Sequence, residues 1–150
     1  MTTIAFRDGI MASDSRIVEY GIGITHGPKI FRKKVGRKEV LIGGAGYSPS
    51  IMMFLDWYGT NDKEGQHRIA TLCIGDKDFE VMIWDGRRIM TCDEFCRLDE
   101  VPEKYYALGS GASNAITAMD CGKSAQQAVQ MAIKRDMNSG GRVVTARLDK

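Results

Sequence analysis

The chain has 150 residues, of which 43% are hydrophobic and 27% charged, so we expect a single domain over residues 1–150 with its own hydrophobic core. Its net charge of +2 requires neither a nucleic-acid partner nor an anionic membrane surface. No apolar run approaches the roughly 20 residues of a membrane-spanning helix. The first residues also lack the basic start and apolar stretch of a signal peptide, so we expect a cytoplasmic protein.

Alternating apolar and polar residues, typical of strands, dominate the first two thirds of the chain. TTIAFR and IMASD flank Asp8-Gly9, which is a strong hairpin signal. Further strands are expected at residues 39–43, 69–75, 79–84, 104–109 and 142–148, with a second hairpin turn at 76–78. Helices are expected at residues 48–59, 112–120 and 124–136. Two groups of strands with helices between and after them predict stacked sheets flanked by helices.

The register of the first hairpin decides which residues face each other. A two-residue turn at Asp8-Gly9 competes with a three-residue turn that also includes Arg7. A slip of one residue moves every side chain to the other face of the sheet, so a buried face selects the register. The three-residue turn gives the more apolar face: Ile4, Phe6, Ile10 and Ala12. We therefore expect this register, which places Thr2 directly opposite Asp14.

Thr2 is the first candidate catalytic residue. Threonine is small enough for methionine aminopeptidase to remove Met1, which would leave Thr2 with a free α-amino group beside its hydroxyl. An α-amino group has an unperturbed pKa of about 7.7–8.0 and can act as a base near neutral pH. Nucleophile and base would then belong to one residue. Threonine is also a good strand residue, and Asp-Ser-Arg can simply end a strand, so the hairpin alone leaves both interpretations open.

Two further segments make the pattern more specific. IGGAGYS (42–48) is a strand running into a glycine turn, and RDMNSGG (135–141) ends the last helix. Together with TTIAFRDGIMASDSR and YALGSGASNA (106–115), they resemble the proteasome β-subunit family of N-terminal nucleophile hydrolases, which includes the bacterial HslV-type peptidase. The resemblance covers nearly the whole chain. It implies an α+β fold, a four-layer αββα sandwich of two antiparallel sheets flanked by helices, and a threonine endopeptidase without a cofactor.

The resemblance also implies roles for individual residues. Thr2 would be the nucleophile, and Asp14 the buried acid beside it. Lys29 would pair with this acid and help the threonine hydroxyl lose its proton, while the Gly46 backbone N–H would stabilise the oxyanion. Ser110 would lie near the threonine amine, and Asp136 and Ser139 would orient this serine and the N-terminus. Arg16 matches the arginine that follows the acid in the family motif.

By position in the family pattern, four residues would line the primary substrate pocket: Ile17, Gly27, Gly44 and Met52. Because Gly44 is small, we expect an open, apolar pocket that accepts large hydrophobic side chains. No metal site is expected, since the sequence has no CxxC pair and neither histidine lies near Cys92 and Cys96. The four cysteines are expected to be reduced thiols.

One segment departs from the family pattern. Only residues 47–68 separate the glycine turn from the next expected strand, where the family usually has two long helices. This length allows one helix and a loop, so one helical layer should be shortened. In the family, such helices build the contacts between subunits and between stacked rings. The shorter layer therefore puts the usual ring architecture in question, although a homo-oligomer is still expected. No propeptide is expected beyond Met1, and the family offers an ATP-driven unfoldase as a partner besides the polypeptide substrate.

Three other interpretations compete with the peptidase. KIFRKKVGRK (29–38) is strongly basic, but no aromatic platform or RNA-binding motif accompanies it, so we expect a solvated hairpin and no nucleic-acid partner. A proteasome-like structural or assembly subunit without turnover is the second. An amidase of the same fold that acts on a non-peptide amide is the third. The joint presence of Thr2, Asp14 and Lys29 argues against an inert subunit but does not distinguish peptides from other amides.

Overall fold

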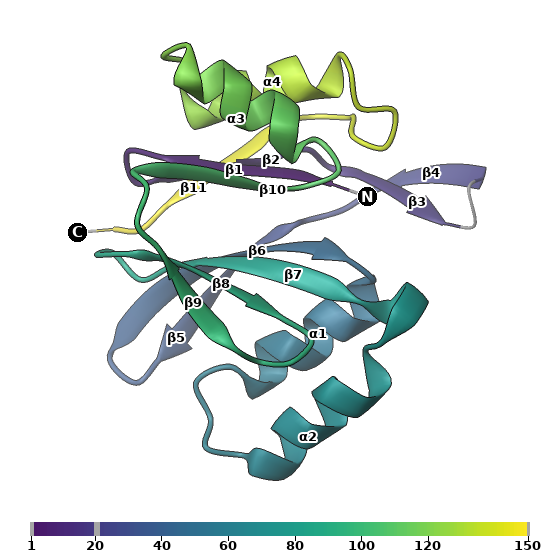
Figure 1. Cartoon of the computed structure of the whole chain (residues 1–150), viewed down its shortest axis with the longest axis vertical. Helices are drawn as coiled ribbons and strands as arrows, with labels where there is room; N and C mark the ends of the chain where they lie inside the picture. Colours follow the sequence, from purple (N-terminus) through teal and green to yellow (C-terminus); the bar gives the residue numbers. More distant parts are fainter. Residues whose placement is uncertain (1, 20–21, 150) are drawn as a thin grey trace.

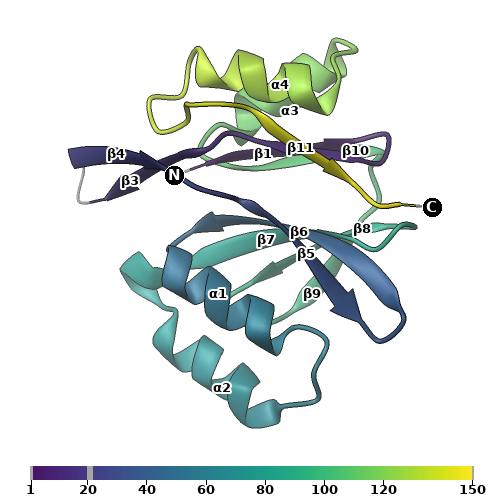
Figure 2. The same ribbon diagram turned by 180° about the vertical axis from the view of Figure 1, so that it is seen from behind.

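In the computed structural model, which describes residues 2–19 and 22–149, the chain forms four layers (Figure 1). Helices α3 (Ala112–Asp120) and α4 (Ala125–Ile133) cover the outer face of one antiparallel sheet. Helices α1 (Ser48–Trp57) and α2 (Lys63–Leu72) cover the outer face of a second antiparallel sheet. Figure 2 shows the same order of layers from behind. The expected αββα sandwich is therefore confirmed.

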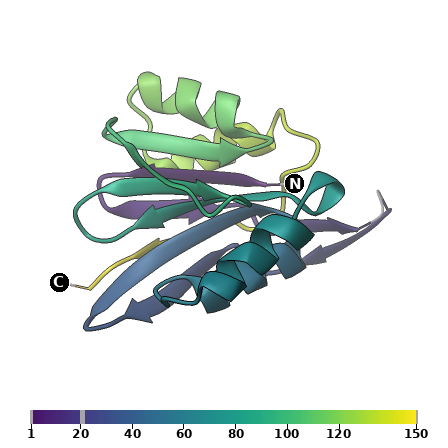
Figure 3. The same cartoon turned by 60° about the horizontal axis from the view of Figure 1, so that its bottom comes forward.

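The first sheet has the strand order β10-β1-β2-β11, and the second has the order β5-β6-β7-β8-β9. The strands of the first are β1 (Thr3–Arg7), β2 (Ile10–Ser13), β10 (Tyr105–Gly109) and β11 (Val144–Arg147). Those of the second are β5 (Ile30–Val35), β6 (Lys38–Gly46), β7 (Phe79–Trp84), β8 (Ile89–Asp93) and β9 (Leu98–Val101). A separate ribbon, formed by β3 (Arg16–Glu19) and β4 (Ile22–His26), projects beyond the sandwich (Figure 3).

The first hairpin has a two-residue turn, so the expected three-residue register is wrong. The turn residues Asp8 and Gly9 both have positive φ angles, 53° and 78°, which suits the tight turn of a twisted hairpin. Both faces of this hairpin are buried, one against the second sheet and the other against α3 and α4. Comparing the two faces therefore could not select the register. As a result, Asp14 lies opposite Thr3 and not Thr2.

Three apolar clusters hold the layers together. The cluster between the two sheets contains Ile4, Phe6, Met11, Leu41, Ala45, Met82, Ile89 and Leu108. The cluster beneath α3 and α4 is built mainly from alanine: Ala5, Ala12, Ala107, Ala115, Ala118, Ala125, Ala128 and Ala132. The cluster beneath α1 and α2 has larger side chains, including Phe54 and Phe79. Small residues let α3 and α4 approach the first sheet closely, while larger ones fill the space beneath α1 and α2.

The layer formed by α1 and α2 contains two helices of 10 residues each, so the expectation of one helix and a loop is wrong. Residues 69–72 continue helix α2 where the sequence predicted a strand at 69–75. The hairpin predicted at 76–78 is wrong as well, because a short 3-10 turn at Gly75–Lys77 leads into β7 instead. This helical layer is no shorter than the one formed by α3 and α4.

Local capping explains why α2 forms. The Asp62 carboxylate accepts a hydrogen bond from the Gly65 N–H at 2.9 Å, which satisfies one of the free donors at the start of the helix. Ile69 and Cys73, four residues apart, are both buried, whereas Leu72 is 54% exposed. That spacing is helical, and the apolar run that suggested a strand is only partly buried.

The basic stretch 29–38 forms the start of the β5–β6 hairpin, whose turn includes Gly36 with a φ angle of 64°. Residues along β5 are half-buried or exposed, so the expected solvated hairpin is confirmed. Among the described residues, no helix combines the length and the apolar character needed to cross a bilayer.

Candidate active site

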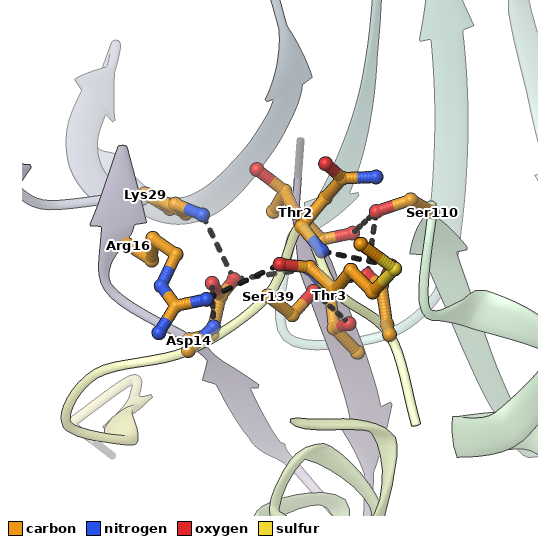
Figure 4. Close-up of polar contacts among 11 residues, drawn as sticks. Thr2, Thr3, Asp14, Arg16, Lys29, Ser110 and Ser139 are labelled. Atoms are coloured by element: carbon orange, nitrogen blue, oxygen red, sulfur yellow. Dashed lines mark hydrogen bonds and ion pairs between the residues drawn. The ribbon is translucent and has the colours of Figure 1, made fainter. Parts of the chain in front are cut away.

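The expected site residues come together at the end of the sandwich where β1 begins. Thr2 directly precedes β1, and the antiparallel pairing of β1 with β2 and β10 brings the ends of those strands beside it. The gathered residues are Asp14 after β2, Lys29 before β5, Gly46 at the end of β6, Ser110 after β10, and Asp136 and Ser139 after α4. In Figure 4, Asp14 and Lys29 lie on one side of Thr2 and Ser110 lies on the other.

Asp14 is the centre of a buried polar cluster. Its side chain is fully buried, and its Oδ1 accepts hydrogen bonds from the Lys29 Nζ at 2.9 Å and the Thr3 N–H at 3.0 Å. Its Oδ2 accepts a third hydrogen bond, from the Gly140 N–H at 2.9 Å. One carboxylate thus joins the N-terminal strand, the chain before β5 and the loop after α4. This arrangement satisfies a charge that would be very costly to bury alone.

Lys29 is also buried, with only 7% of its side chain exposed. Burial lowers the pKa of Lys29 below its usual value, although the hydrogen bond and the negative charge of Asp14 oppose this shift. The lysine therefore gives up its proton more readily than an exposed lysine. It places an amino group, held by a fixed partner, beside Thr2 (Figure 4).

A second carboxylate, Asp136, lies on the opposite side. Its Oδ2 accepts hydrogen bonds from the hydroxyls of Ser110, at 2.6 Å, and Ser139. Burial favours the neutral acid, but these two hydroxyls and the Asn138 N–H outweigh it and lower the pKa of Asp136. The Ser110 oxygen also lies 3.4 Å from the Thr2 carbonyl oxygen, which is a second acceptor within reach of the same hydroxyl. Asp136 is therefore connected to the candidate nucleophile through a serine.

Two glycines fit positions where no side chain has room. Gly46 has a φ angle of 116°, and a Cβ there would lie 2.5 Å from the Asp78 carbonyl oxygen. Gly109, at the end of β10, has a φ angle of 94°, and a Cβ would lie 2.0 Å from the Thr2 carbonyl oxygen. The backbone at Gly109 can approach Thr2 this closely only because the residue lacks a side chain, and Gly46 can pack against the chain at Asp78 and Phe79 for the same reason.

Two pockets adjoin Thr2, and Thr2 and Gly46 line both of them. The first has a volume of about 340 Å³ and is lined largely by apolar groups from β3, β5, β6 and α1. Three of the expected pocket residues, Ile17, Gly44 and Met52, lie in it. Gly27 lines a different pocket, together with His26 and Arg142, and the side chain of Ile17 packs against Gly27.

The second pocket has a volume of about 440 Å³ and lies on the Ser110 side of Thr2. Its lining includes four acidic residues, from the segment before β7, from β7 itself, and from the end of β8: Asp78, Glu80, Asp93 and Glu94. No sequence motif had pointed to this pocket.

Arg16 lies near the centre without touching Asp14 through a hydrogen bond. Its guanidinium donates to the Met137 carbonyl at 3.2 Å and packs over Gly140, where a Cβ would lie 2.5 Å from it. It therefore holds the loop that carries Gly140 against β3.

Sequence reasoning missed two contributors, Thr3 and Gly140. The Thr3 hydroxyl forms a 2.7 Å hydrogen bond with the Ser139 hydroxyl, and its N–H donates to Asp14. Gly140 supplies the other backbone donor to that carboxylate. The second threonine of the TT pair was a visible signal, whereas a backbone donor leaves no mark in the sequence.

This arrangement can serve nucleophilic attack by a hydroxyl. A hydroxyl-bearing residue is placed between a buried lysine–carboxylate pair and a serine–carboxylate pair, with an adjoining glycine turn. The buried cysteines are not part of it, because Cys73, Cys92 and Cys96 lie in the apolar cluster beneath α1 and α2. Burial there raises the pKa of Cys92 to about 12 and that of Cys96 to about 11. Within the described ranges, no group of three or more His, Cys, Asp or Glu side chains could hold a metal ion.

Comparisons with known proteins agree with this architecture. No protein-family model and no curated protein matches the sequence. BPH from Thiobacillus denitrificans is 19% identical, with a TM-score of 0.72 over 99% of this chain and 97% of its own. A second structure of that protein, in complex with epoxomicin, is 21% identical with a TM-score of 0.68.

Two other solved structures share the fold. Eukaryotic HslV from Trypanosoma brucei is 12% identical, with a TM-score of 0.66 over 97% of each chain. Anbu, an ancestral beta-subunit from Yersinia bercovieri, is 13% identical, with a TM-score of 0.71 over 97% of this chain and 80% of its own. The chain therefore has the fold of the proteasome-like proteins of the N-terminal nucleophile hydrolase class.

Proposed function

We propose that the protein is a threonine peptidase that uses Thr2 as its nucleophile. Removal of Met1, which lies outside the described residues, would free the α-amino group of Thr2 beside its hydroxyl. The observation that carries the proposal is the position of Thr2 between the Asp14–Lys29 pair and the Ser110–Asp136 pair. A residue chosen only for strand formation would not need two carboxylate centres around it.

In the proposed reaction, the α-amino group accepts the hydroxyl proton while Oγ1 of Thr2 adds to the peptide carbonyl carbon. The Lys29 charge favours the developing alkoxide, and the Gly46 N–H stabilises the oxyanion. The carbon–nitrogen bond then breaks, and the ammonium of Thr2 gives its proton to the leaving amine. Water hydrolyses the remaining threonine ester by the same route and restores the hydroxyl. Ser110, Asp136 and Ser139 orient the amine.

The complex of BPH with epoxomicin supports the choice of probe. An epoxyketone has two electrophilic carbons, which the hydroxyl and the amine of one N-terminal residue can both attack. Intact mass and N-terminal sequence of the purified protein should show a chain that begins at Thr2 and gains one inhibitor mass. Thr2→Ala should gain none. Thr145→Ala, a change at an exposed threonine of β11, should react like the wild type.

The same experiment separates the competing functions. A chain that keeps Met1 and gains no inhibitor mass would contradict the peptidase and favour a structural or assembly subunit. A chain that forms the adduct but cleaves no peptide would favour an amidase acting on another amide. Sedimentation of the same sample tests the predicted homo-oligomer.

We place the residue before the cleaved bond in the 340 Å³ pocket, which Ile17, Gly44 and Met52 line. A Cβ at Gly44 would lie 2.7 Å from the Ile51 side chain, so Gly44 packs directly against Ile51, and the pocket beside them is large and lined mainly by apolar groups. The pocket should therefore accept large apolar side chains. Equal cleavage after acidic, basic and apolar residues in a fluorogenic peptide panel would contradict this assignment.

A further inference from the structure

The two pockets beside Thr2 differ strongly in charge. The charged residues that line the 340 Å³ pocket are Arg16 and Lys29, and the lysine is buried and paired with Asp14. The 440 Å³ pocket is lined by four acidic residues and contains no lysine or arginine: Asp78, Glu80, Asp93 and Glu94. Among the described residues, none of these four side chains forms an ion pair. Their charges therefore face the pocket or solvent without a cation to neutralise them.

The position of the acidic pocket makes it part of the substrate path. Thr2 and Gly46 are shared by both pockets, so a peptide bond attacked at Thr2 would lie between them. The apolar pocket would hold the residue before the cleaved bond. The acidic pocket would then hold the chain that follows it. Ser110, which we propose to orient the amine, lines this second pocket, and the amine must deliver its proton to the leaving group.

We propose that this acidic pocket selects substrates with lysine or arginine on the leaving-group side of the cleaved bond. The inference rests on the proposed peptidase function and adds to it a requirement on substrate charge. Carboxylates around a concave surface concentrate negative potential and attract a cationic side chain. An acidic residue at the same position is repelled by the same charges. The proposed occupant is a basic residue of the polypeptide, because its cationic side chain complements the four carboxylates that line the pocket.

The four acids are not equivalent as targets for mutation. The Glu80 carboxylate accepts a hydrogen bond from the Gly109 N–H at 3.0 Å, and that of Asp93 accepts one from the Phe95 N–H at 3.0 Å. Changing either would disturb the backbone near Thr2 or the β8–β9 turn. For Asp78 and Glu94, the described residues provide no side-chain hydrogen bond of this kind. Asp78→Asn with Glu94→Gln therefore removes two charges with little change in shape.

The test uses quenched peptides that differ only in the residue after the cleaved bond, which is lysine, glutamine or glutamate. We expect kcat/KM to fall in that order, with about a tenfold difference between lysine and glutamate at low ionic strength. Salt at 0.5 M should reduce the ratio of kcat/KM for the lysine peptide to that for the glutamate peptide to roughly threefold, because exposed charges are screened. The Asp78→Asn/Glu94→Gln variant should lose most of the ratio. Glu103→Gln, at an exposed acid beyond the far end of β10, should keep it.

The ratio is its own control for folding, since a partly unfolded variant lowers both rates together. Equal cleavage of the lysine and glutamate peptides, by protein that forms the Thr2 adduct, would overturn the inference and leave the peptidase intact. A lysine preference as large in the Asp78→Asn/Glu94→Gln variant as in the wild type would also overturn the inference and leave the peptidase intact. Absence of both cleavage and adduct would overturn the proposed function, and this inference with it.

Discussion

Asp14 and Asp136 carry the same chemical group on opposite sides of the N-terminal threonines, yet their surroundings differ. Asp14 is fully buried and bound to a buried lysine and two backbone N–H groups. Asp136 is only half-buried, and its partners are two serine hydroxyls and one backbone N–H. The comparison separates a charge that the fold requires from one that mainly orients other groups.

The difference follows from the cost of removing a charge from water. A buried ion pair gives little net stability over an apolar pair, but removing one partner leaves an uncompensated charge. Asp14 and Lys29 therefore depend on each other, and the loop at Gly140 depends on Asp14. Asp136 can recruit water when a partner is lost, so its replacement should disturb orientation more than stability.

Asp14→Asn should have the largest effect. The amide keeps the shape of the side chain but leaves Lys29 buried without its counter-ion, which typically costs about 3–5 kcal/mol. The free energy of unfolding, measured by urea denaturation, should fall by this amount, and peptide cleavage should be lost. Asp136→Asn is the matched control and should lose about 1 kcal/mol or less. Equal losses for the two variants would contradict the contrast.

Ser139→Ala should have an intermediate effect, because Ser139 connects the two sides. Its hydroxyl contacts both the Thr3 hydroxyl and the Asp136 carboxylate, and the residue is 2% exposed. Alanine would leave the Thr3 hydroxyl buried and without that partner, at a cost of about 1–3 kcal/mol. Combining Ser139→Ala with Thr3→Val should recover part of this loss in urea denaturation. A double variant that shows the sum of two independent losses would indicate that the hydroxyls are not coupled.

The gathering of the site residues could be predicted, whereas their register could not. The resemblance to the proteasome β-subunit family implied that Asp14, Lys29, Asp136 and Ser139 share one centre, and in the structure each lies at or just beyond the end of a strand or helix on that edge. The hairpin of β1 and β2 was predicted correctly, but its register was predicted incorrectly because both faces of this hairpin are buried. A hydrophobic pattern identifies a register only where one face meets water.

Helix α2 shows the other limit of the sequence pattern. The end of this helix and the residues just after it look like a strand because Ile69, Leu72 and Ile74 are apolar, but Leu72 and Ile74 are more than half exposed. By contrast, α4 was predicted well, because Ser124 and Gln127 form a capping box and its apolar residues make one stripe. The acidic pocket could not be foreseen, since strand pairing brings Glu80 and Asp93 together from separate segments.

Lys29 should leave a signature at alkaline pH. Its pKa is lowered in the folded protein by burial, so between the folded pKa and the unfolded value of about 10.4 the unfolded state binds more protons. The free energy of unfolding, relative to that of Lys29→Met, should therefore rise as the pH increases through this window. Urea midpoints of the two proteins at matched pH values measure the difference. A difference in urea midpoint that does not change with pH would mean that burial does not shift the pKa of this lysine.

Asp136 should give the smallest effect, at the opposite end of the pH scale. Hydrogen bonds from Ser110, Ser139 and Asn138 outweigh burial and lower its pKa below the unfolded value of about 3.9. Its contribution to stability is therefore fully present above that value and is lost as the pH falls through the folded pKa. The difference in urea midpoint between the wild type and Asp136→Asn should be constant near neutral pH and shrink in acid. Because the carboxylate is half-exposed, a large difference would show that Asp136, like Asp14, is required by the fold.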